Sequence, residues 1–107
     1  MAWVLLVLAG LFEVGMALCL KASDGFSNVR ASVGFAVFAV LSFGLLATAL
    51  RDLPVGTAYA VWTGIGAAGT ALLGVALLGD AATPLRLGSI ALIVLGVVGL
   101  RVGGGAA

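Results

Sequence analysis

The chain has 107 residues, of which 64% are hydrophobic and 8% are charged, and its mean hydropathy is +1.35. An ordinary soluble domain carries about 25% charged residues, so this composition indicates a membrane protein. The net charge of +1 argues against a nucleic-acid surface, and the lack of histidine argues against a histidine metal site. A single cysteine cannot form an intrachain disulfide. We expect neither a metal nor a cofactor.

Four segments are apolar over the roughly 20 residues that a membrane span requires. They cover residues 2–20, 31–50, 55–78 and 85–102. The connections between them are short, so consecutive helices should be antiparallel neighbours. Pro54 and the Thr83-Pro84 pair suit helix starts, with Thr83 as an N-cap. We therefore predict an all-α membrane protein in which residues 1–107 form a single four-helix transmembrane domain and residues 103–107 a short flexible end.

The first span contains one carboxylate, Glu13, near its middle. A charged side chain at that depth costs roughly 2.5–3.5 kcal/mol on insertion scales, so an acid kept there is expected to handle ions or protons. Gly10, Met16 and Ala17 share its helical face and leave space beside it. Apolar surroundings disfavour the charged form, so Glu13 can hold a proton or a cation, but not both. That is the minimum for proton-coupled antiport. The alternative is a structural, hydrogen-bonded glutamate.

The second and third spans offer polar and aromatic groups at depth. Ser42 either bonds its own backbone or orients the membrane carboxylate. Tyr59 and Trp62 are three residues apart on one face, with Gly56 a turn earlier and Thr63 alongside. Aromatic faces attract cations, so this face is a candidate cation site, with ordinary core packing as the alternative.

Glycine is frequent, with 17 residues, and several lie in the third span. Gly64 and Gly66 favour either a bend in that helix or close packing against a neighbour. The fourth span has no side chain suited to chemistry. Its small residues Gly88, Ser89 and Gly96 indicate packing, and we expect them at a dimer interface.

Basic residues leave the orientation of the chain nearly undecided. Four spans place Arg51 and Arg101 on one side and Lys21, Arg30 and Arg86 on the other. A difference of one is too small for a firm assignment by the positive-inside rule, so copies can insert both ways. An antiparallel pair would bring two membrane carboxylates to one site and form an inverted repeat from two chains.

At this level of detail the chain resembles the small multidrug resistance family of transporters along nearly its whole length. The most specific motif is LPVGTAYAVWTGIG over residues 53–66. Further matches are GLFEV over residues 10–14, Leu20-Lys21 with residues 24–26, Ser42-Phe43 and residues 45–46.

The resemblance implies an antiparallel, dual-topology dimer that exchanges protons for small cations across the bacterial inner membrane. The family's essential glutamate falls on Glu13, its aromatic pair on Tyr59 and Trp62, its glycine on Gly56 and its second-span serine on Ser42. The fourth span corresponds to the family's dimerisation helix.

Within the family, Gly10, the WTGIGA run over residues 62–67 and the basic Arg101 are similar to the guanidinium-exporting subtype. Met16 departs from it, because that subtype usually has tryptophan three residues after the glutamate. Methionine is flexible, so a broader quaternary-ammonium, multidrug exporter is the alternative, as is one subunit of a paired heterodimer. From other classes, a cation channel would use rings of acids rather than one, and a structural subunit would tolerate Glu13→Gln. An enzyme is not expected, because the sequence offers no pair of a nucleophile and a base.

Overall fold

Four α-helices make up the computed structural model, which describes residues 1–104. Their bounds are Ala2–Ala22 (α1), Val29–Ala49 (α2), Val55–Leu77 (α3) and Pro84–Gly104 (α4). Each is long and apolar enough to cross a membrane, and residues 1–104 contain no strand, so the predicted all-α class with four spans is confirmed. The expected flexible end at residues 103–107 is wrong for residues 103–104, which belong to α4; residues 105–107 lie outside the described part.

Local side chains explain where the helices start. The backbone N–H of Ala31 donates to Asn28 Oδ1 at 3.1 Å, so α2 begins at Val29 rather than at residue 31. The N–H of Arg86 donates to Thr83 Oγ1 at 3.1 Å, which confirms the predicted N-cap of α4. The starts of α1 and α3 coincide with the apolar runs, and the other ends differ from them by one or two residues in either direction, which is the usual uncertainty of helix ends.

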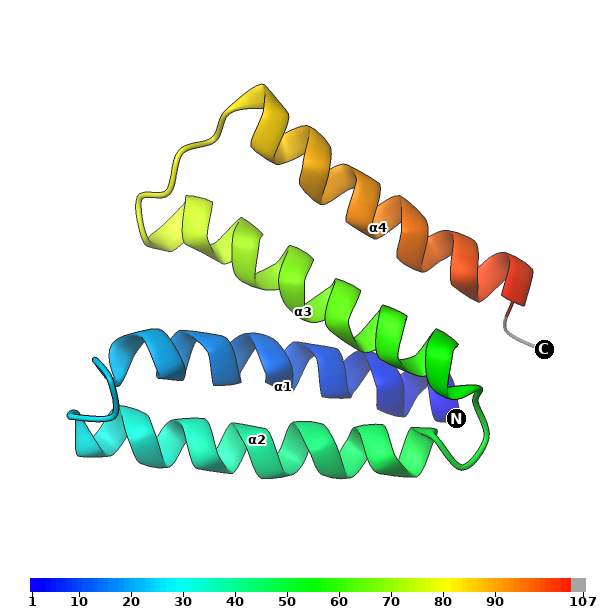
Figure 1. Cartoon of the computed structure of the whole chain (residues 1–107), viewed down its shortest axis with the longest axis horizontal. Coiled ribbons are helices and arrows are strands. Elements are labelled where there is room, and N and C mark those ends of the chain that lie inside the picture. Colours follow the sequence, from blue (N-terminus) through cyan, green and yellow to red (C-terminus); the bar gives the residue numbers. More distant parts are fainter. Residues whose placement is uncertain (105–107) are drawn as a thin grey trace.

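The helices form a three-helix group with α4 attached to one side. Figure 1 shows α1 beside α2, α3 crossing over α1, and α4 on the far side of α3. Helices α1 and α2 are antiparallel, whereas α1 and α3 run side by side in the same direction. Within residues 1–104, the backbone of α4 approaches only α3. The buried core therefore lies among the first three helices, where it includes Leu6, Ala9, Leu46 and Val61.

Glycines set how closely the helices approach. A side chain at Gly15 would overlap the Phe38 ring of α2, and one at Gly34 would overlap Cys19. Small residues act in this way in membrane helices, where dispersion forces replace the hydrophobic effect. Gly64 receives Val97 of α4 in the same manner. The α1–α2 and α3–α4 contacts are thus fixed by shape.

Most of α4 remains uncovered in one chain. Leu85, Leu92 and Leu95 are 82%, 71% and 65% exposed. Added Cβ atoms at Gly88 and Gly96 would meet open space. This face must contact lipid or another chain, and its role as a dimer interface stays a prediction.

Candidate functional site

One buried hydroxyl joins the three packed helices. Ser42 Oγ of α2 donates to the backbone carbonyl of Ala9 in α1 at 2.6 Å, and Trp62 Nε1–H of α3 donates to Ser42 Oγ at 2.9 Å. Ser42 is fully buried and Trp62 is 8% exposed. The expectation that Ser42 bonds its own backbone was wrong, because its hydroxyl bonds Ala9 and Trp62. It makes no direct bond to Glu13 of the same chain within residues 1–104, and a role in orienting that carboxylate stays a prediction. Ser42 instead fixes the indole of Trp62 against α1.

Glu13 lies one helical turn beyond Ala9 on α1, and its carboxyl group rests against Gly66 of α3. A Cβ at position 66 would overlap Glu13 Oε1, so the carboxyl group can occupy this position only because residue 66 is glycine. Glu13 Oε1 is buried and has no hydrogen-bond partner within residues 1–104. The alternative of a structural, hydrogen-bonded glutamate finds no support at this oxygen.

The parallel register of α1 and α3 positions this carboxyl group. Three residues before Glu13, a side chain at Gly10 would overlap Ile65, and directly after Glu13, Val14 packs into the space left by Gly69. These contacts hold the two helices in close approach on both sides of the carboxyl. The sequence left open whether Gly64 and Gly66 bend α3 or pack it; both make close contacts within one continuous helix.

Two aromatic rings pack against the fixed indole of Trp62. Tyr59 packs edge-on to Trp62 with ring centroids 5.6 Å apart, and Phe43 of α2 lies 5.2 Å from Trp62 at 52°. Tyr59 is 47% exposed and Phe43 is 48% exposed, so these two residues lie at the surface of the single chain, next to the buried ring of Trp62. Phe43 was not among the sequence candidates. A signal was available in its position next to Ser42, but one aromatic in an apolar span is not distinctive by itself.

The remaining candidates, Gly56, Thr63 and Met16, are less buried than Ser42 and Trp62. Thr63 and Gly56 are exposed, and the space around Gly56 is open. Met16 is half-buried on α1, one turn after Glu13. The structure of one chain therefore brings Glu13, Ser42 and Trp62 into one region through the packing of α1, α2 and α3, and leaves Gly56, Thr63 and Met16 at its margin.

The site combines one carboxyl group with aromatic faces, all at membrane depth. In residues 1–104, histidine, cysteine, aspartate and glutamate side chains nowhere gather into a metal-binding group. A carboxylate in a membrane span is costly unless a proton or a cation neutralises it. The arrangement suits reversible cation binding.

These features define a four-helix membrane protein with one acid in a span, whose Oε1 is buried, and sequence comparison assigns it to a family. A family model described as "Small Multidrug Resistance protein" matches residues 1–93. The chain belongs to the small multidrug resistance family, which confirms the resemblance found in the motifs.

Individual relatives are similar over almost their full lengths. A protein of Escherichia coli (strain K12) named "Guanidinium exporter" is 55% identical over 101 residues, which cover 94% of this chain and 96% of the relative. Proteins of the same name from Yersinia pestis and Salmonella typhimurium are 54% and 50% identical over 101 residues. Those alignments again cover 94% of this chain, and 97% and 96% of the relatives.

Proposed function

We propose that this protein is a proton-coupled antiporter that exports small cations of guanidinium type across the bacterial inner membrane. The observation that carries the proposal is Glu13 Oε1, a buried carboxyl oxygen in a membrane span with no hydrogen-bond partner within residues 1–104. The names of the relatives support the guanidinium class of substrate.

Competition for one carboxyl group accounts for exchange. A bare carboxylate at this depth is unfavourable by roughly 2.5–3.5 kcal/mol, so the occupied states are protonated Glu13 and cation-bound Glu13. The proton must leave before the cation binds, and the cation must leave before the proton returns. Movement of one ligand is thereby coupled to movement of the other in the opposite direction.

The neighbouring groups suit a guanidinium ion. Guanidinium is planar and can donate two parallel N–H bonds to one carboxylate while stacking on an aromatic face. Trp62 offers such a face, and its orientation is fixed by the hydrogen bond to Ser42. Tyr59, packed edge-on to Trp62, extends the aromatic wall. Glu13 would supply charge, and the rings would supply shape.

Alternating access requires a second chain in this proposal. One chain leaves Tyr59, Phe43 and most of α4 exposed. A partner inserted in the opposite orientation would cover these surfaces through α4 and add a second Glu13 to the same chamber. Such a pair has the inverted symmetry by which many transporters open to either side in turn.

A broader specificity for quaternary ammonium ions is a second candidate. Its support is the exposed rings of Tyr59 and Phe43, together with Met16 on the glutamate face. Quaternary ammonium ions carry no N–H donor and bind through aromatic faces and charge. A flexible methionine can make room for their alkyl groups.

Transport currents from purified protein on a solid-supported membrane test the proposal. Guanidinium should produce a proton-coupled current that Glu13→Gln abolishes, because the neutral amide has no titratable proton to exchange and no negative charge to pair with a cation. Asp24→Asn, which removes an exposed acid in the α1–α2 loop, should leave the current unchanged. Full transport by Glu13→Gln would refute the mechanism. Tetrapropylammonium, applied in parallel, should be silent for a selective exporter, and a current from both cations would establish the broader specificity.

A further inference from the structure

A groove of about 260 Å³ opens between α1, α3 and α4. It lies at the end of the molecule that holds the N-terminus, the α2–α3 loop and the last turns of α4 (Figure 1). Its apolar walls are formed by Trp3, Val7, Val61, Ile65, Val97 and Val98. The lining is completed by a single charged side chain, that of Arg101.

The path of α4 creates this groove. Val97 packs into the space left by Gly64, which brings α4 against α3, whereas the backbone of α4 does not approach α1. Across the resulting gap, the Arg101 guanidinium carbon lies 5.0 Å above the centre of the Trp3 ring. This cation–π contact joins α1 and α4, and the groove runs beside it.

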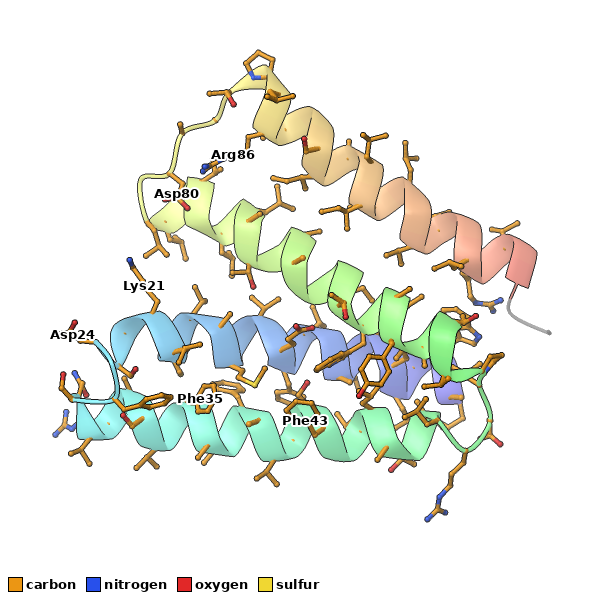
Figure 2. The ribbon with its side chains drawn as sticks, viewed as in Figure 1. Lys21, Asp24, Phe35, Phe43, Asp80 and Arg86 are labelled. Carbon is orange, nitrogen blue, oxygen red and sulfur yellow. The ribbon has the colours of Figure 1, made fainter. Side chains whose placement is uncertain are left out.

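The charge of Arg101 is not neutralised by any carboxylate in the described part of the chain. The ion pair found in residues 1–104 joins Asp80 and Arg86 at 3.8 Å, at the α3–α4 loop. Figure 2 shows these two side chains at the end of the molecule away from the N-terminus, together with Lys21. A guanidinium stacked on an indole still presents N–H donors at its edge, and those donors match a phosphate group.

We propose that this groove is a binding site for an anionic glycerophospholipid. Arg101 contacts the lipid phosphate, and a segment of one acyl chain lies along the apolar side chains of Val7, Ile65 and Val98. The volume is below the roughly 300–1,000 Å³ of pockets that enclose whole small molecules, which fits a chain segment passing along a groove.

The position of the two polar-tipped residues supports a lipid as the occupant. Tryptophan and arginine at the ends of spans sit at headgroup level, where Trp3 and Arg101 would meet the phosphate layer. Basic pockets between membrane helices bind anionic headgroups by the same chemistry. The inference does not depend on transport: it concerns the face of the helices away from Ser42 and would hold for a chain that carries no cation.

Native mass spectrometry of the full-length protein in micelles doped with phosphatidylglycerol or phosphatidylcholine tests the charge. Wild type should retain phosphatidylglycerol adducts in preference to phosphatidylcholine. Arg101→Gln should weaken phosphatidylglycerol binding about fivefold, the effect of one cation near an anionic lipid. Arg51→Gln, an exposed cation at the same end, should not change it. Equal retention by Arg101→Gln and wild type, or an equal loss in both variants, would overturn the proposal.

A second pair of variants tests the groove itself. Val98→Phe fills the groove and keeps Arg101, so it should also reduce phosphatidylglycerol adducts. Val33→Phe, on the outer face of α2, is the matched control, since the two valines are 51% and 57% exposed. If Val98→Phe instead changes the number of chains per particle and leaves lipid binding intact, a second copy occupies the groove and the lipid assignment is wrong.

Discussion

Replacing Ser42 with alanine removes one buried hydroxyl and two interhelical hydrogen bonds at once. Each such bond in a membrane protein contributes about 0.6 kcal/mol on average and at most about 1.7. Trp62 Nε1–H, 8% exposed as a residue, is then left without its acceptor, at a cost of about 1–3 kcal/mol. The terms overlap, so we expect a total of about 1–3 kcal/mol.

The loss should be measurable in cation binding as well as in stability, because Ser42 fixes the aromatic face in addition to joining α2 to the Ala9 carbonyl of α1. A change of about 1–3 kcal/mol corresponds to an apparent guanidinium affinity between about 5-fold and about 150-fold weaker. Tryptophan fluorescence titration and transport currents measure it. Thr48→Ala is the control: Thr48 donates to the carbonyl of Gly44 in its own helix at 2.9 Å and is exposed. Equal effects of the two variants would refute the positioning role of Ser42.

Two further perturbations address space and orientation. Gly66→Ala places a Cβ where Glu13 Oε1 lies, so exchange currents should fall at least tenfold. Gly44→Ala is the control, because its Cβ meets open space and should leave the currents intact. Similar currents from the two variants would refute the proposed fit of Glu13 against Gly66. Lysines at Ser27, Ala81 and Ala82 add charge to the exposed loops on one side and should fix the orientation. Such a chain should transport only when co-expressed with an oppositely biased partner, and full activity alone would exclude an antiparallel pair.

Sequence reasoning reached the helices because their determinants are local. Runs of apolar residues define the spans, and Thr83 marks a helix start through its own side chain. Asn28 was the exception: its cap extends α2 two residues beyond the apolar run, and it was overlooked because the run itself begins at residue 31. The end of α4 was missed for a related reason, since glycine disfavours helices in water but is tolerated in lipid.

The acid was found because its cost is evident from its position alone, whereas its surroundings depend on registers that the sequence does not encode locally. Ser42 meets Ala9 only because α1 and α2 align as they do, and a shift of one residue would turn the hydroxyl away. Gly66 carries no chemical group at all; its role at Glu13 is the absence of a Cβ, visible only once α3 is placed beside α1. In any other register of α1 and α3, Gly66 would not face Glu13 and would only allow close helix packing. A candidate site made of one costly group and several small residues can therefore be proposed from sequence, but its shape follows from helix pairing.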